Sequence, residues 1–265
     1  MPDALAALDA RYIPADWTAP LSLRADLLAH EQPIVIALPG AGCSPALFRD
    51  LVCTAGMPWM PLDWFMGEGA FDPVAIADRI AGLLAHRAGP TVLAGHSLGA
   101  FLSLLVGLRH GTALGPRLAG LILSNTGART VGHGDPSLPE RILHHWTPQA
   151  QQAFLEACFH VPPPEPLARH LQHYLAALPA ERLHAAVSGL RQMDVLHELP
   201  RLRLPVLVAH GELDRKRSVQ TAREMAQALP LGRLVLLSAG HTPMVECPGD
   251  YHAAASTFLN DLRSD

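Results

Sequence analysis

A five-residue segment, Gly-His-Ser-Leu-Gly at 95–99, constrains the fold of this 265-residue chain more than any other feature. It lies between the apolar runs 91–94 and 100–106, which predict a buried strand and a helix. A turn this sharp strains the serine backbone, and side chains two positions before and after it would collide. Glycine at both positions removes them. The segment therefore predicts a strand, a tight corner and a helix, with the Ser97 hydroxyl lifted clear of the sheet.

This arrangement resembles the nucleophile elbow of the α/β-hydrolase superfamily, whose motif is G-x-S-x-G. The resemblance covers roughly residues 33–129 and 204–262. It implies an α/β fold with a mostly parallel sheet, helices on both faces and an inserted helical lid. It also implies that Ser97 is a nucleophile and that the amide of Leu98 faces a developing oxyanion. The alternative is a glycine-flanked serine in an ordinary loop, which the strand before it and the helix after it disfavour.

Near-continuous apolar runs alternate with helical patterns over most of the chain, which is typical of a parallel sheet covered on both faces. The runs expected to be further strands are 33–38, 118–124, 205–210 and 233–237, with a short strand near 59–64. The helices expected between and after them are 45–54, 74–86, 100–110, 221–229 and 251–262.

This alternation stops between residues 130 and 203, where helical stretches follow one another. They cover 148–158, 167–178 and 181–193. Because the strand pattern then resumes, we expect residues 1–129 and 204–265 to form the α/β-hydrolase core and residues 130–203 to form the lid. Superfamily members usually open with a β-hairpin, and whether residues 1–32 form one is left open.

Serine is a weak nucleophile at neutral pH and needs an adjacent base. The superfamily order is serine, acid, histidine, which assigns His241 as the base and Asp214 as the acid that holds the imidazole. Both residues follow predicted strands, at the sheet edge where open α/β sheets place their sites. Glu212 is an alternative acid. Asn125 follows an earlier strand where some relatives keep the acid, but an amide bears no charge.

The loop after the run 33–38 begins Pro-Gly-Ala-Gly, where related hydrolases carry His-Gly and supply the second oxyanion amide. This variant resembles the corresponding loop of type II thioesterases. By position, Ala41 is the expected second oxyanion donor, with Gly42 as the alternative. Cys43, beside this loop, is expected to pack rather than react. His96 is expected to support the site rather than to take part in catalysis.

Candidate residues for the substrate pocket are Trp146, Phe159, Tyr174 and Met244. The alternative for aromatic residues in lid helices is that they form the core of the lid. Arg129, Arg141 or Arg191 could pair with a substrate carboxylate. The segment 125–129 resembles one found in 3-oxoadipate enol-lactonases, which would suit such a substrate. The low charge of the pocket segments otherwise predicts a small, mainly apolar molecule.

Composition narrows the function classes further. A net charge of −4 with no basic block argues against nucleic-acid and anionic-membrane surfaces. No apolar run approaches membrane-spanning length, and the N-terminus lacks a basic and then apolar leader pattern. Four scattered cysteines fit a reducing compartment, so we expect a cytoplasmic protein. No metal-ligand or nucleotide motif is present in the sequence, so no metal or other cofactor is expected.

These patterns predict a serine hydrolase that cleaves a carboxylic ester, lactone or thioester through an acyl-enzyme. One alternative is a carbon–carbon bond hydrolase of ring-cleavage products, which uses the same three residues. That family often has tryptophan after the catalytic histidine, where this chain has Thr242. The other alternative is a non-catalytic ligand sensor on the same scaffold. The oligomeric state is not predicted.

Overall fold

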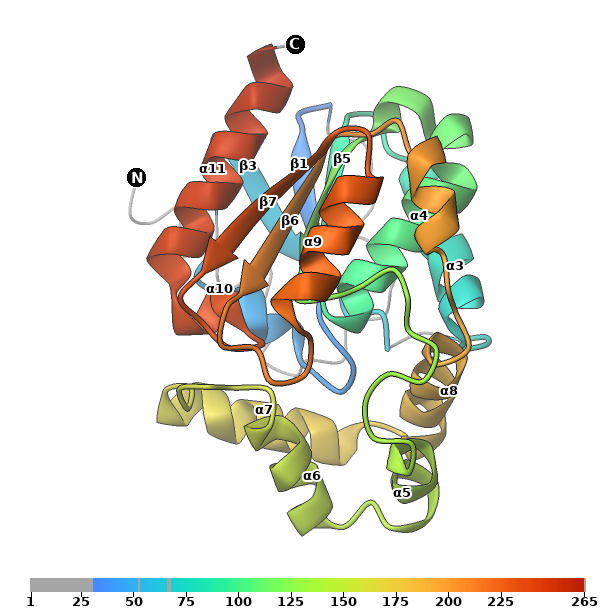
Figure 1. Cartoon of the computed structure of the whole chain (residues 1–265), viewed down its shortest axis with the longest axis vertical. Helices are drawn as coiled ribbons and strands as arrows, with labels where there is room; N and C mark the ends of the chain where they lie inside the picture. Colours follow the sequence, from blue (N-terminus) through green and yellow to red (C-terminus); the bar gives the residue numbers. More distant parts are fainter. Residues whose placement is uncertain (1–30, 52, 66–67, 265) are drawn as a thin grey trace.

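The computed structural model describes residues 31–51, 53–65 and 68–264, so the question of an opening hairpin lies outside the described residues. A seven-stranded sheet in the order β2-β3-β1-β4-β5-β6-β7 forms its centre (Figure 1). The strands are β1 (Ile34–Leu38), β2 (Cys53–Thr54), β3 (Met57–Pro61), β4 (Thr91–His96), β5 (Leu118–Ser124), β6 (Val206–Gly211) and β7 (Gly232–Leu237). Only β2 and β3 pair antiparallel, and the remaining pairs are parallel. The predicted α/β class is confirmed.

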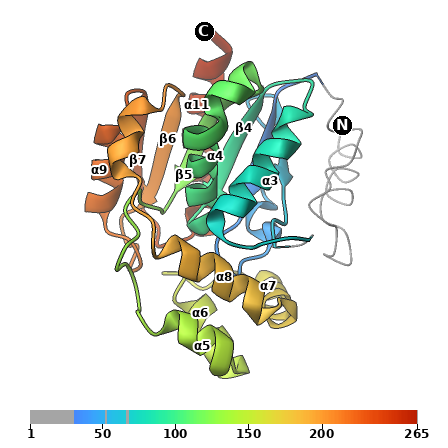
Figure 2. The same ribbon diagram turned by 90° about the vertical axis from the view of Figure 1, so that its right-hand side faces the viewer.

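Helices cover both faces of this sheet, as the continuous apolar strands require. Helices α3 (Pro73–Ala85) and α4 (Leu98–Leu114) lie on one face and α11 (Pro248–Ser264) on the other, while α9 (Val219–Ala228) packs on β6 and β7 (Figure 2). Residues 98–117 are the one helical stretch in the described part that is long and apolar enough to cross a membrane. Most of that stretch is buried against the sheet and α3, which is the environment of a core helix.

Two local predictions are wrong. Residues 45–54 do not form one helix, because a single 3₁₀ turn, η1 (Pro45–Phe48), is followed by strand β2. Ala55 and Gly56, at φ of 52° and 75°, then turn the chain back into β3. Helix α4 does not end at Gly111 but continues to Leu114, where Gly115 takes the left-handed φ of 54° that ends it.

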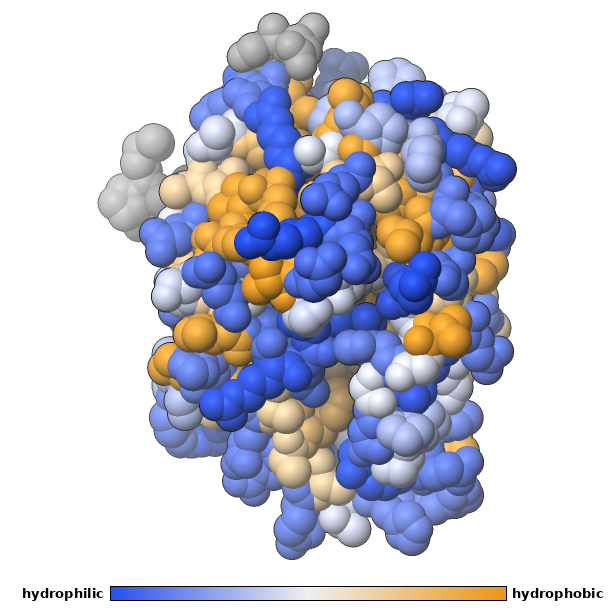
Figure 3. Space-filling view, in the orientation of Figure 1, coloured by the Kyte–Doolittle hydropathy of each residue, from blue (hydrophilic) through white to orange (hydrophobic). Residues whose placement is uncertain are grey.

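Four helices lie between β5 and β6 in the part of the chain predicted to be a lid. They are α5 (Leu138–His144), α6 (Pro148–Glu156), α7 (Glu165–Ala177) and α8 (Ala180–Leu190). They gather at one end of the sheet (Figures 1 and 2), where α5 packs on α8 and α6 on α7. Their buried residues include Leu155, Leu171 and Leu183. On the outer surface, hydrophilic side chains break up the hydrophobic areas of the face drawn in Figure 3.

Candidate active site

Ser97 occupies the tight corner between β4 and α4, with φ of 53° and ψ of −114°. Both flanking glycines are needed there. A Cβ at Gly95 would lie 2.3 Å from the Cα of Ala100, and one at Gly99 would lie 2.1 Å from the carbonyl oxygen of Leu38. No real Cβ tolerates such contacts, so the backbone would have to move. The strand, corner and helix therefore have the geometry that the glycine spacing predicts.

Three side chains far apart in the sequence meet at this corner. The Nε2 atom of His241 lies 3.0 Å from Oγ of Ser97, and its Nδ1 atom lies 2.8 Å from Oδ2 of Asp214. Nδ1–H can donate to the carboxylate while Nε2 accepts the serine hydroxyl proton. The imidazole is 4% exposed, which keeps the pair largely out of water. The structure thus brings together the three residues that the sequence singled out for nucleophile, base and acid.

Asp214 accepts four hydrogen bonds. Its Oδ2 atom accepts from Nδ2 of Asn125 at 2.7 Å as well as from His241, and its Oδ1 atom accepts from the amides of Lys216 and Arg217 at 2.7 and 3.1 Å. Burial alone would raise the pKa of this carboxyl, but the hydrogen bonds from His241 and Asn125 hold it well below its usual range. Asp214 is therefore ionised at neutral pH.

Asn125 and Glu212 are the two other residues that were weighed as the acid beside Asp214. Asn125 is not an acid but a partner of the acid, and it also donates to the carbonyl oxygen of Gly240 at 3.1 Å. Its φ of 50° lies in the left-handed region, which asparagine tolerates better than most residues. Glu212 is exposed, whereas the side chain of Asp214 is fully buried beside the imidazole.

Glu246 is a supporting residue that sequence reasoning missed. It lies in the short helix α10 (Pro243–Glu246), and its carboxylate accepts from the amides of Gly240 and Thr242 on either side of His241. It also accepts from the amides of His160 and Val161, which follow α6. One carboxylate thus ties the His241 loop to the inserted helices. No motif marked it, although an acid five residues after the candidate base was visible.

His96 is buried beneath the site and donates from Nε2 to the carbonyl oxygen of His241 at 2.9 Å. Its Nδ1 atom has no hydrogen-bond partner among the described residues, and Gly40 packs closely against this ring. Burial, together with the neighbouring His241, lowers the pKa of His96 to about 3. The neutral ring therefore holds the backbone of His241, the candidate base, through this hydrogen bond.

This buried histidine predicts acid sensitivity. Its folded pKa lies below the unfolded value of 6.5, so the unfolded chain takes up a proton first and stability falls as the pH drops below 6.5. We expect His96 alone to cost about 2 kcal/mol of unfolding free energy between pH 7 and pH 5. Urea denaturation at both pH values measures the loss, and His96→Gln should make it smaller. His144→Gln, which changes an exposed histidine, is the control. An unchanged pH dependence in His96→Gln would contradict the prediction.

The two predicted oxyanion donors border the same space. Leu98 is the first residue of α4, and the first amides of an α-helix have no acceptor within it. Ala41 lies in the loop after β1, which Nε1 of Trp64 holds by donating to the carbonyl oxygen of Pro39 at 2.8 Å. This loop lies close to Ser97: a Cβ atom added to Gly40 would be 3.1 Å from the Cβ atom of Ser97. The amides of Leu98 and Ala41 remain the predicted oxyanion hole.

A cavity of about 540 Å³ opens above Ser97 between the sheet and the inserted helices. Its apolar wall comes mainly from α5, α6 and α8. The residues of this wall are Leu138, Ala150, Ala153, Phe154, Ala157, Val187 and Leu190. Basic side chains also line the cavity, namely Arg141, Arg191, Arg215, Lys216 and Arg217. Arg129 does not, since its exposed guanidinium pairs with Asp194 at 3.0 Å.

The four predicted pocket residues, Trp146, Phe159, Tyr174 and Met244, are not among those that line this cavity, which corrects the prediction. Trp146 packs edge-on against Phe154. Tyr174 is buried and donates its hydroxyl to Asp63 at 2.8 Å. Met244 is buried in the hydrophobic core, and Phe159 is partly buried and packs against this core. The side chains chosen for their size are therefore buried or packed between elements, and other residues of α5, α6 and α8 line the cavity.

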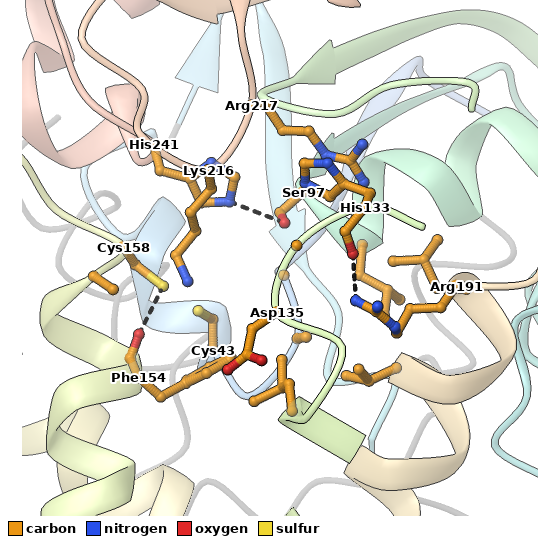
Figure 4. Close-up of a pocket in the computed structure, with 18 of the residues that line it drawn as sticks. Cys43, Ser97, His133, Asp135, Phe154, Cys158, Arg191, Lys216, Arg217 and His241 are labelled. Carbon is orange, nitrogen blue, oxygen red and sulfur yellow. Dashed lines mark hydrogen bonds between the residues drawn. The ribbon is translucent and has the colours of Figure 1, made fainter. Parts of the chain in front are cut away.

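Two thiols face each other on one side of Ser97. Cys158 donates from Sγ to the carbonyl oxygen of Phe154 at 3.4 Å, with Cys43 beside it and the Lys216 ammonium 4.8 Å from the centre of the Phe154 ring (Figure 4). The hydrogen bond with Cys43 and the charge of Lys216 lower the pKa of Cys158 to about 6, although burial opposes this. The hydrogen bond with Cys158 and burial raise the pKa of Cys43 well above its ordinary value. Cys43 thus lines a cavity rather than only packing.

This difference predicts selective alkylation. A thiol whose pKa is lowered forms more thiolate, the reactive form, at a given pH. We therefore expect iodoacetamide to modify Cys158 well before Cys43, although both thiols line the same cavity. Peptide mass spectrometry over a time course measures the order. Lys216→Met, which keeps the bulk and removes the charge, should slow the reaction of Cys158. Faster modification of Cys43 would contradict the assignment.

No group of three or more histidine, cysteine, aspartate or glutamate side chains that could hold a metal ion is found within the described ranges.

Comparison with known proteins gives consistent matches. The model of the alpha/beta hydrolase family matches residues 9–255. Pimeloyl-[acyl-carrier protein] methyl ester esterase of Edwardsiella ictaluri is 24% identical over 243 residues, covering 85% of this chain and 93% of that enzyme. An esterase from Exiguobacterium antarcticum has a TM-score of 0.76 at 20% identity, covering 89% of this chain and 93% of the other. The enol-lactonase from Burkholderia xenovorans LB400 has a TM-score of 0.74 at 20% identity, covering 87% of this chain and 93% of the other.

Proposed function

The chain belongs to the alpha/beta hydrolase family, and we propose that it is a serine hydrolase that cleaves a carboxylic ester, lactone or thioester through an acyl-enzyme. The observation that carries this proposal is the line of hydrogen bonds from Ser97 through His241 to Asp214 at the floor of a cavity. Relatives named as esterases support a hydrolase that acts on esters or similar bonds. The finer substrate class is our proposal.

The mechanism follows from the donor and acceptor positions. Ser97 Oγ attacks the carbonyl carbon while Nε2 of His241 takes its proton, and the ionised Asp214 stabilises the imidazolium that forms. The amides of Leu98 and Ala41 bind the oxyanion, each worth on the order of 10²–10³ in turnover. His241 then gives its proton to the leaving group. Water, activated by the same imidazole, attacks the acyl-enzyme and releases Ser97.

Residues 130–203 act as the lid in this proposal, and residues 1–129 and 204–265 as the core. Helices α5, α6 and α8 supply the cavity wall opposite Ser97, so their position decides which substrates fit. The contacts of Glu246 with residues 160 and 161 join the segment between α6 and α7 of this lid to the loop that carries His241. The lid and the base are therefore expected to move together if they move at all.

The substrate is a small molecule in this proposal, with neither nucleic acid nor a membrane as partner. We also propose that the protein works in the cytoplasm. The ground for this is that the four cysteines are widely scattered in the sequence, which fits a reducing compartment better than a disulfide framework.

A fluorophosphonate probe tests the proposal directly, because it reacts only with an activated serine. Wild-type protein should be labelled at Ser97 and should hydrolyse 4-nitrophenyl esters of two to eight carbons, whereas Ser97→Ala should do neither. Labelling at Ser97 without turnover of any ester would favour the ligand sensor. Turnover of a coloured ring-cleavage dienoate, with no ester hydrolysed, would favour the carbon–carbon hydrolase. Labelling of another residue would refute the proposal.

A further inference from the structure

The side of the cavity opposite the two thiols is positively charged. Figure 4 shows His133, Arg191 and Arg217 on that side of Ser97, and all three line the cavity. They come from the loop after β5, the end of α8 and the segment before α9. Elements far apart in the sequence therefore place two guanidinium groups and an imidazole beside the candidate nucleophile.

Arg217 is the most constrained of these groups, because its residue is only 7% exposed. A guanidinium does not lose its proton in proteins, so burying it costs free energy unless an anion or several acceptors compensate. Burial lowers the pKa of Arg217 to about 10, which reflects that cost. Its side chain makes one hydrogen bond, from Nη1 to the carbonyl oxygen of Arg129 at 3.3 Å. Most of its donors remain available to the cavity.

No carboxylate within the described ranges forms an ion pair with Arg217 or Arg191. Asp214 is the acid whose charge Arg217 feels, but its oxygens already accept four hydrogen bonds. Asp135, the acid that lines the cavity, pairs with Arg141 at 2.9 Å. Arg191 donates to the carbonyl oxygen of His133. Neither guanidinium group therefore has a carboxylate in direct contact, although the charge of Arg191 helps to lower the pKa of Asp135.

The pKa of His133 is affected by the same positive charges. Burial and the charges of Arg217, His241 and Arg191 lower the pKa of His133 to about 4, so its ring is neutral at pH 7. A neutral imidazole can still donate one hydrogen bond to an anion. The apolar residues Val187 and Leu190 continue the same wall of the cavity along α8. An acid head group and an apolar chain would both be accommodated.

We propose that the substrate carries a carboxylate, which Arg217 and Arg191 bind on the His133 side of the cavity while Ser97 attacks an ester, lactone or thioester carbonyl elsewhere in the same molecule. This inference rests on the proposed function and narrows its substrate class to anionic esters. Guanidinium groups match carboxylates because their planar donors form paired, charge-assisted hydrogen bonds.

A matched pair of substrates tests the inference, namely the mono-4-nitrophenyl ester of adipic acid and the same ester with a carboxamide in place of the free acid. We expect kcat/KM for the acid to exceed that for the amide by roughly ten- to a hundredfold, mainly through KM. Arg191→Gln and Arg217→Gln should each bring this ratio towards one. Arg217→Lys keeps the charge and guards against a folding defect at a buried site. Arg129→Gln, which changes an exposed arginine outside the cavity, should leave the ratio unchanged.

The outcomes separate this inference from the proposed function. If Ser97 is labelled and both esters react equally in wild-type protein, the carboxylate site is refuted and the hydrolase proposal stands. If neither ester reacts, calorimetry of Ser97→Ala with monomethyl adipate and its carboxamide analogue decides. Tighter binding of the acid, weakened in Arg191→Gln, supports the site, and equal binding refutes it. Raising the salt concentration from 50 to 500 mM should also reduce the preference for the acid.

Discussion

Replacing Ser97 with alanine is expected to lower kcat on 4-nitrophenyl esters by on the order of 10⁶-fold. The variant removes the only oxygen that lies within hydrogen-bond reach of Nε2 of His241 in the described residues. Its residual rate should come from the oxyanion amides and substrate binding, which work without a nucleophile. Active-site titration and single-turnover kinetics measure the loss and separate it from trace wild-type contamination.

The matched control for this variant is Ser103→Ala in α4, the helix that begins directly after Ser97. The Ser103 hydroxyl is buried and donates to the carbonyl oxygen of Gly99 at 3.0 Å, and the residue is not among those that line the cavity. Its loss should leave turnover unchanged. Circular dichroism and thermal melting should show that both variants fold. If the folded Ser97→Ala variant turned over every substrate at the wild-type rate, the covalent mechanism would be refuted.

Replacing Asp214 with asparagine is expected to lower kcat by about 10⁴-fold with little change in KM. The amide can no longer stabilise the imidazolium, and its NH₂ group can turn towards Nδ1 of His241 and select the wrong tautomer. Asn125 would aggravate this, since its Nδ2 donor now faces a neutral amide instead of a carboxylate. Steady-state kinetics and the fluorophosphonate labelling rate of the variant both measure the effect.

Glu212→Gln is the matched control, because it changes a carboxylate two residues away that is exposed in the structure. Its kinetics should equal those of wild type. The opposite pattern, with Glu212→Gln inactive and Asp214→Asn active, would identify Glu212 as the acid. Loss of activity in both variants would point to a general charge effect rather than to a partner of His241.

The sheet and its helices could be predicted because their signals are local. Strand β5 has the predicted bounds, 118–124, since a continuous apolar run between breakers is visible without tertiary information. The prediction of one helix over 45–54 was wrong because a proline at the first position of a helix does not indicate where the helix ends. In the structure the 3₁₀ turn η1 is short and β2 follows it. The turn at Ala55 and Gly56, both at positive φ, then leads the chain from β2 into β3.

The cavity wall could not be predicted, and its residues show why. Tyr174 and Met244 have the size and apolarity expected of a pocket, yet both are buried between elements instead. An amphipathic pattern identifies the apolar face of a helix but not what covers that face. Arg217 was not singled out, because its position beside Ser97 depends on how β6, α9 and the loop after β5 pack.

The sequence by itself determined the corner at Ser97, the order of strands and helices, and the choice of His241 and Asp214 as its partners. The corner follows from backbone requirements that neighbouring residues encode, and the choice of His241 and Asp214 follows from the residue order of the superfamily that this corner resembles. Only the tertiary structure decided that Asn125 and Glu246 support those partners and that one side of the cavity is positively charged. Such contacts join residues up to about a hundred positions apart, and no local pattern records which of many polar side chains will meet once the core has packed.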